Sequence, residues 1–155
     1  MKYLVFLALT LETVSATGTS TSDFAAPCYG TALPSLPPST ANRVIPWGTA
    51  GITFANGSTC CSSLDQVRAG IDAVDDQLLE LLSQRAAFVR EATRFKATRD
   101  TVDVPSRDVA VIDGAVEDAP SHKLPQNIAK LVFTAIINAS VPFELCIFDE
   151  FGAGC

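Results

Sequence analysis

Arginine and lysine are the residues of this sequence best placed to do chemistry. Arg85 occupies a position in a helical hydrophobic pattern that should hold an apolar side chain, and burying an unpaired guanidinium costs free energy. Lys96 follows eleven residues later, about 16 Å along a helix and within about 20° of the same direction. We therefore expect the two long side chains to converge on an anionic ligand. The alternative is that Arg85 pairs with a carboxylate and has a structural role.

Arg68 is a third candidate cation, but it is too distant to act with the other two from one helix. It precedes Arg85 by seventeen residues, which is about 25 Å of helix. A second, antiparallel copy of the chain would bring its own Arg68 to the same ligand. The spacing therefore predicts a site that two chains share.

The composition limits the chemistry that these cations can support. The 155 residues include one histidine, His122, and no Cys-x-x-Cys pair, which argues against histidine-based catalysis, a histidine-rich metal site and thioredoxin-like chemistry. The formal net charge of −6 argues against a nucleic-acid partner, which requires a basic surface. Catalysis would therefore depend on arginine, lysine, carboxyl and hydroxyl groups.

A long first helix is predicted to carry the three cations. Seam positions recur in steps of three and four residues at Leu64, Val67, Ile71, Val74, Leu78, Leu81, Arg85, Phe88, Ala92 and Phe95. This repeat is typical of a helix, here from 64 to about 98, that packs along a coiled-coil-like seam. Ser63 is the expected N-cap, and Gln66 completes a capping-box pattern. Such a helix is about 50 Å long, too long for a chain of this size to cover at both ends, so we expect a homodimer.

Two further helices complete a predicted all-α fold. A short helix is expected from Pro105 to about Asp118, because proline is favoured at the first helical position. A third helix is expected from about 125 to 148, with Pro142 inside it. Their predicted inner faces carry Val109, Ile112 and Val116 on the short helix, and Leu131, Ala135, Ile136, Ala139 and Phe143 on the third.

The N-terminal part of the chain differs in composition from the helical body, 63–155. Residues 1–16 combine Lys2, an apolar run and small residues at their end, which is typical of a secretory signal and predicts an extracellular protein. Residues 17–62 are rich in Pro, Gly, Ser and Thr and predict a loop-rich arm, with Trp47 buried over the body. The leader is too short to span a bilayer, and we expect no later apolar run of about 20 residues and no membrane partner.

Cysteines and glycosylation sequons agree with secretion. The five cysteines are Cys28, Cys60, Cys61, Cys146 and Cys155. An odd number leaves at least one thiol free or paired between chains. Because Cys60 and Cys61 are adjacent, we expect each to bridge to a distant partner. Of the two sequons, Asn56 is expected in a loop and accessible to glycosylation, whereas Asn138 falls inside a predicted helix.

Four separated patches of the body share their order and spacing with one known family. They are Leu64-Asp65-x-x-Arg68 continued through Arg85, Lys96 after ten intervening residues, Pro105-Ser106-Arg107-Asp108, and Ile136-Ile137-Asn138-Ala139-Ser140-Val141-Pro142-Phe143-Glu144. These patches resemble the all-helical, AroQ-type chorismate mutases over about residues 63–148. The resemblance implies a three-helix fold with one long first helix and an intertwined dimer, preceded in this chain by the arm.

The resemblance also implies catalytic roles for matching side chains. Arg68 would cross into the partner's site and bind one substrate carboxylate, and Arg85 would bind the other. Lys96 would donate to a carboxylate and to the ether oxygen of the substrate. Glu144 would lie opposite Lys96 at that oxygen.

Four more positions would surround the substrate ring. By the same resemblance, Arg107 would support the ring end, and Asp108 would orient the ring hydroxyl with a shorter reach than the family's Glu. Ser140 would line the side of the ring. Val104 stands where many bacterial relatives carry an Asp, so the hydroxyl would be held less firmly.

The implied function is that of a secreted chorismate mutase that converts chorismate to prephenate without a metal or cofactor. The strings Arg94-Phe95-Lys96-Ala97 and Val104-Pro105-x-Arg107 resemble isochorismate-pyruvate lyases, which use the same scaffold, equally well. Both are pericyclic reactions of a dianionic enolpyruvyl ether and need fixed cations and donors at the breaking bond. Secreted relatives from plant-associated and parasitic organisms are thought to act on host chorismate pools and so on salicylate defence. A third reading is a catalytically inactive secreted binding protein, against which the retained site residues argue.

Overall fold

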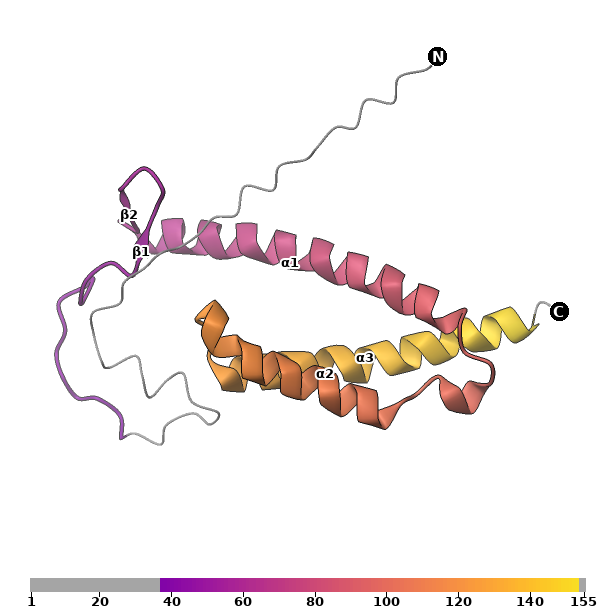
Figure 1. Ribbon diagram of the computed structural model, residues 1–155. Helices are drawn as coiled ribbons and strands as arrows, with labels where there is room; N and C mark the ends of the chain where they lie inside the picture. Colours follow the sequence, from indigo (N-terminus) through magenta and orange to yellow (C-terminus); the bar gives the residue numbers. More distant parts are fainter. Residues whose placement is uncertain (1–36, 154–155) are drawn as a thin grey trace, which may run out of the picture. The chain divides into compact units, whose positions relative to one another are not determined.

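The computed structural model describes residues 37–153 of the chain. These residues fall into two compact units, one of residues 41–72 and one of residues 37–40 with 73–153. The helix α1 (Leu64–Thr93) begins in the first unit and continues into the second (Figure 1). The expected signal at 1–16, the first part of the arm, Cys28 and Cys155 lie outside the described residues.

The first unit contains a short antiparallel hairpin within the predicted arm. β1 (Ile52–Thr53) pairs with β2 (Thr59–Cys60). In the turn, Gly57 adopts a left-handed φ of 81° that favours glycine. Asn56 Oδ1 accepts hydrogen bonds from the Ser58 backbone N–H at 3.0 Å and from its hydroxyl at 2.6 Å. The sequon asparagine Asn56 is therefore exposed in a loop, as predicted.

Trp47 is exposed, so the prediction that it is buried is wrong. The residue is 57% exposed, and the Arg43 guanidinium lies 4.6 Å from the centroid of its ring, within the range of a cation–π contact. Its apolar neighbours Val44 and Ile45 are exposed as well. An apolar cluster in the sequence is therefore not by itself a sign of burial.

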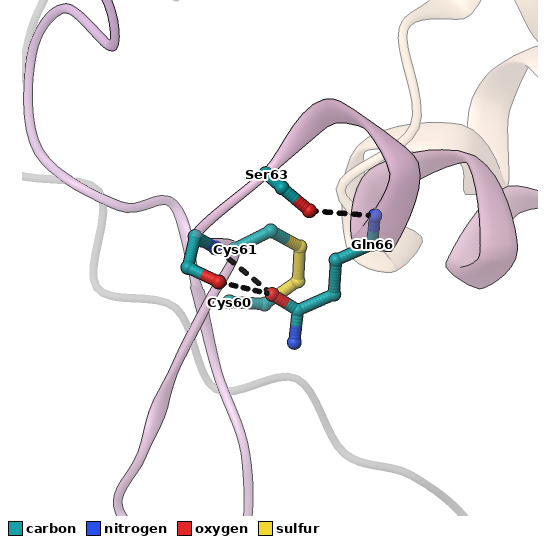
Figure 2. Close-up of a disulfide and its surroundings, with 5 residues drawn as sticks. Cys60, Cys61, Ser63 and Gln66 are labelled. Carbon is teal, nitrogen blue, oxygen red and sulfur yellow. Dashed lines mark hydrogen bonds between the residues drawn. A yellow bond between two sulfur atoms is a disulfide. The ribbon is translucent and has the colours of Figure 1, made fainter.

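The start of α1 follows a disulfide and is fixed by side-chain caps (Figure 2). Cys60 and Cys61 are joined to each other, so the prediction that each bridges to a distant cysteine is wrong. The peptide bond between them is cis, and their Cα atoms are 3.0 Å apart. Ser63 Oγ accepts the Gln66 backbone N–H at 3.2 Å, as the capping box predicts. The Gln66 side chain accepts from Ser62 instead of Ser63, at 2.9 Å from the backbone N–H and 3.1 Å from the hydroxyl.

The far end of α1 lies at Thr93, earlier than the predicted 98. Arg94, Phe95 and Lys96 donate their backbone N–H groups to carbonyls three residues back, at 3.1, 3.0 and 3.0 Å. This tighter, 3₁₀-type pattern commonly closes an α-helix. Lys96 therefore lies on a turn and not on the helix face. The short helix η2 (Arg99–Thr101) follows it.

The second unit pairs α2 (Pro105–Asp118) with α3 (Gln126–Ala153), which lie side by side (Figure 1). α2 begins at Pro105 as predicted, and Pro142 lies inside α3. The short helix η3 (Ala119–His122) joins the two helices, and Gln126 Nε2 donates to the Val116 carbonyl at 3.1 Å across this connection. The three-helix, all-α prediction for the body is confirmed.

The buried face of α3 differs from the predicted one. Ala129 and Ile137 are buried, whereas Leu131 is exposed, as is Val109 on α2. The predicted inner residues Ala135, Ile136, Ala139 and Phe143 instead line a hollow of about 380 Å³ against Leu82, Arg85 and Ala86 of α1. The prediction selected the wrong face because α3 is apolar on two sides.

The apolar character of α3 also corrects the expectation that no long apolar run follows the leader. Residues 126–151 contain an 18-residue window with a mean hydropathy of 1.9 and are long and apolar enough to cross a membrane, by length and composition alone. Helices with apolar contacts on more than one side have the same composition in protein cores. In this chain, however, only 6% of the apolar window of α3 is buried among the described residues.

Candidate active site

A pocket of about 340 Å³ collects most of the residues selected from the sequence. It lies in the second unit between the end of α1, the loop that follows it, α2 and α3. Its lining includes seven of the predicted site residues: Arg85, Lys96, Val104, Arg107, Asp108, Ser140 and Glu144. These side chains come from four segments that are far apart in the sequence, so the fold brings them together as the order of the patches required.

Arg85 enters the pocket from α1 and is anchored by a hydroxyl. Its Nη1 donates to Ser140 Oγ at 2.6 Å, while Ser140 Oγ donates to the Ile136 carbonyl of the previous turn at 2.7 Å. The serine proton is therefore committed to the backbone, and an oxygen lone pair faces the guanidinium. The structural alternative, a carboxylate partner for Arg85, does not occur among the described residues.

The other two cations of the pocket, like Arg85, take part in none of the ion pairs found among the described residues. Those pairs are Arg68–Asp65, Arg94–Glu91 and Arg99–Asp149. Lys96 and Arg107 belong to none of them, although both line the pocket. Three positive charges therefore face a small space without a carboxylate in salt-bridge contact, an arrangement that favours a ligand with more than one negative group.

Glu144 lines the same pocket as these charges and has a buried carboxyl oxygen. Its Oε1 is buried and has no hydrogen-bond partner among the described residues. Burial raises the pKa of Glu144, the positive charge of Lys96 opposes the rise, and the carboxylates of Asp108 and Asp103 add to it. The net direction is upward, so Glu144 holds its proton to a higher pH than an exposed glutamate and can donate a hydrogen bond.

Asp108 is a second carboxyl with a raised pKa. Burial is the largest cause, followed by the negative charge of Asp103 and a hydrogen bond between the two side chains, while Lys96 lowers the pKa. The sequence analysis did not select Asp103. Its effect depends on the turn that precedes α2, and no helical spacing relates it to the other site residues.

The remaining lining of the pocket is apolar. The residues that the sequence analysis did not place in the site are Phe88, Val89, Ala92, Val102, Val111, Ile137 and Val141. Phe88 and Ala92 belong to the predicted seam of α1, so periodicity identified them as apolar contacts but not as pocket walls. Phe88 is 78% exposed, so the apolar side of the pocket is open to solvent at this residue.

Arg68 belongs to the first unit, whereas the lining of this pocket comes entirely from the second. Its Nη1 donates to Asp65 Oδ1 at 3.2 Å, three residues earlier on α1, and the side chain is exposed. Among the predicted catalytic and substrate-binding residues, Arg68 is thus the one that does not line this pocket.

Comparison with known proteins agrees with this geometry. The family model for chorismate mutase type II matches residues 67–145. Over 78 residues, the chain is 28% identical to the isochorismate pyruvate lyase of Pseudomonas aeruginosa, an alignment that covers 50% of this chain and 77% of that protein. The matched region contains every residue that lines the pocket. The chain therefore belongs to the chorismate mutase type II family, as its resemblance predicted.

Proposed function

We propose that the protein is a chorismate mutase that rearranges chorismate to prephenate in the pocket between α1, α2 and α3. The observation that carries this proposal is the convergence of three cations, outside the ion pairs of the described residues, and two carboxyls of raised pKa around one small space. Chorismate is a dianion, so its two carboxylates match the fixed positive charges. The apolar walls match the ring that carries them.

The proposed mechanism requires only binding and hydrogen bonding. The rearrangement breaks the ether C–O bond while a C–C bond forms in the same molecule, so no group leaves and no redox partner is needed. Arg85, oriented by Ser140, holds one carboxylate in the compact conformation in which the reacting carbons approach. Lys96 and protonated Glu144 donate to the ether oxygen, where negative charge develops in the transition state.

Arg107 and Asp108 would act at the ring end of the substrate. Both lie in the first turn of α2, which begins at Pro105. Arg107 adds positive charge there, and Asp108 can donate to or accept from the ring hydroxyl, depending on its protonation. The Val104 side chain has no polar atom, so the hydroxyl would depend on Asp108.

The second carboxylate would be bound by Arg68 from a partner chain. This proposal rests on the position of Arg68 in the other compact unit and on the exposed apolar seam of α1. An exposed apolar stripe of this length marks an association surface. A homodimer built on α1 would cover the seam and complete each pocket.

Isochorismate-pyruvate cleavage is the second candidate function. The specific observation in its favour is that the curated relative described above is named as an isochorismate pyruvate lyase. That reaction also breaks an ether bond in a dianionic substrate and would use the same cations. A third candidate, an inactive binding protein, requires that the same pocket bind a dianion without turnover.

Product identification separates the three candidates. Purified protein is incubated with chorismate and, separately, with isochorismate, and the products are resolved by chromatography. Prephenate from chorismate supports the proposal. Salicylate and pyruvate from isochorismate, with no prephenate, support the lyase. Binding of either compound without any product supports the inactive binding protein.

We also propose that the protein is exported and acts outside the cell on chorismate that it encounters there, including that of a host. The support is the leader-like sequence at 1–16 and the cysteine content. Expression of the full chain in a eukaryotic secretory host tests this. A product in the medium that begins near residue 17 supports export, and full-length protein retained in the cytosol contradicts it.

A further inference from the structure

The loop between α1 and α2 forms one wall of the pocket. We call residues 97–104, which include η2, the η2 segment. It starts directly after Lys96 and ends at Val104, the residue that precedes α2. Lys96, Val102 and Val104 all line the pocket. A displacement of this segment would therefore move a catalytic cation and two wall residues together.

Short-range hydrogen bonds give the η2 segment a structure of its own. Thr101 Oγ1 donates to the Thr98 carbonyl at 2.6 Å and accepts the Thr98 backbone N–H at 3.3 Å. The Val102 backbone N–H donates to the Arg99 carbonyl at 3.2 Å. These bonds hold the segment together. Its C-terminal end is attached by the buried Val102 side chain and by the hydrogen bond between Asp103 and Asp108 of α2.

Arg99 attaches the other end of the segment to α3. Its Nε donates to Asp149 Oδ1 at 2.9 Å and its Nη2 donates to Asp149 Oδ2 at 3.3 Å. The two parallel bonds form the bidentate fork that gives an arginine–carboxylate pair its directionality. Among the side-chain hydrogen bonds of the described residues, this pair is the one that joins the η2 segment to α3. Asp149 lies beyond the part of the chain that carries the family match.

We propose that Arg99 and Asp149 are positioning residues whose ion pair latches the η2 segment to α3 and so holds Lys96, Val102 and Val104 at the pocket. Neither side chain lines the pocket, so both act through the segment. The two side chains are 61% and 49% exposed. An exposed pair of this kind contributes modestly, so the latch can open to admit a ligand and close again. The catalytic part of this inference rests on the proposed function, and the structural part does not.

Hydrogen exchange of the full-length protein tests the latch without an activity assay. Asp149→Asn removes the charge at nearly constant size. Because exposed ion pairs have small coupling energies, we expect the Thr101 and Val102 amides to exchange about three- to fivefold faster, with the amides of α2 unchanged.

Glu91→Gln is the matched control. It breaks the Arg94–Glu91 pair, whose side chains are 63% and 56% exposed and lie three residues apart. Unchanged exchange in Asp149→Asn, or the same acceleration in Glu91→Gln, overturns the latch.

Steady-state kinetics test the positioning role. We expect Asp149→Asn to lower kcat/KM by about three- to fivefold. Asp149→Glu keeps the carboxylate and should recover most of this loss. An Asp149→Asn variant with faster exchange but unchanged kcat/KM overturns the positioning role. A parent protein inactive toward both chorismate and isochorismate contradicts the proposed function instead, and the exchange result still decides whether the latch exists.

Discussion

The apolar stripes of α1 and α3 have the same helical spacing but different cover. On α3, Ala129 and Ile137 are 1% and 8% exposed, on a helix that packs against α2. On α1, the seam residues Val74 and Leu78 are 60% and 45% exposed. A hydrophobic repeat thus predicts which face of a helix needs cover, but it does not predict whether the same chain supplies that cover.

Within the second unit, the burial of α1 increases toward the pocket. Arg85 and Val89 are half-buried and Thr93 is buried, whereas Leu81, one turn before Arg85, is exposed. The pocket therefore lies where the stripe of α1 gains contacts from its own chain. The open part of the stripe is the surface we assign to a second copy.

The largest expected effect comes from Arg85, at the covered end of the stripe. Arg85→Leu should reduce kcat/KM by about 10²- to 10³-fold, because a fixed charge that binds the substrate in the transition state is lost. The melting temperature should stay the same or rise, since a half-buried charge is replaced by an apolar side chain. Arg90→Leu, at an exposed position on the same helix, is the control and should leave activity unchanged. Retained activity with a lower melting temperature would make Arg85 a structural residue.

The open stripe is tested by placing a charge in it. Leu78→Lys should weaken a dimer by about 100-fold, because the ammonium would be buried without a partner in the interface. Activity should fall with the dimer, since Arg68 of the partner is lost from each pocket. Analytical ultracentrifugation measures the dissociation constant. Ser83→Lys changes an exposed position of α1 outside the seam and should have no effect. An unchanged oligomeric state in Leu78→Lys would leave the stripe without its proposed cover.

Because Glu144 lies on α3 at the pocket and is proposed to act in its protonated form, we expect activity to decline at alkaline pH. Its carboxyl donates to the ether oxygen only when protonated, and its pKa is raised by burial, so turnover should fall about tenfold per pH unit above that raised pKa. Glu144→Gln keeps a neutral donor and should flatten the alkaline limb. Glu150→Gln, on an exposed part of α3, should not. If the Gln variant at 144 declines like the parent, another group titrates.

The stability of the protein should follow the same group in the same direction. The folded-state pKa of Glu144 lies above the ordinary value of 4.5. The proton it binds therefore stabilises the folded state fully below pH 4.5, and this contribution is lost as the pH rises through the raised pKa. Urea unfolding at several pH values should show a shallower dependence for Glu144→Gln than for the parent.

The smallest effect is expected at Ser140, which orients Arg85. Ser140→Ala removes one hydrogen bond to the guanidinium, so kcat/KM should fall by about three- to tenfold. Thr134→Ala removes a hydroxyl that also donates to the carbonyl four residues back on α3, at 2.7 Å, but lies outside the pocket. The two variants should lose similar helix stability and differ in activity. Equal activities would mean that Ser140 serves only its own helix.

Local signals in the sequence predicted where helices begin. Pro105 and the pairing of Ser63 with Gln66 mark the starts of α2 and α1 correctly. The ends were less predictable, because they depend on tertiary contacts: α1 closes at Thr93 by a tighter turn, and α3 continues to Ala153. The predictions that Trp47 is buried and that Cys60 and Cys61 bridge to distant cysteines were wrong for a related reason. Composition does not determine which groups meet in space.

The sequence pattern of the family predicted more of the candidate site than the spacing of residues along a helix did. Lys96 lines the same pocket as Arg85, but from a turn and not from a shared helix face. Asp103 and the Arg99–Asp149 pair were not found, because each depends on how the η2 segment folds. The spacing of residues predicts which side chains share a face only as far as the same helix continues.

Mixing two inactive variants tests the central claim most directly, which is that each pocket is completed by a second chain. Arg68→Ala and Arg85→Ala are purified, combined in equal amounts, unfolded and refolded together, and assayed with chorismate. Random pairing in a symmetric dimer places one intact pocket in each heterodimer, so about a quarter of the parent activity should return. No recovery in the mixture, or an Arg68→Ala protein as active as the parent, would contradict a site shared between two chains.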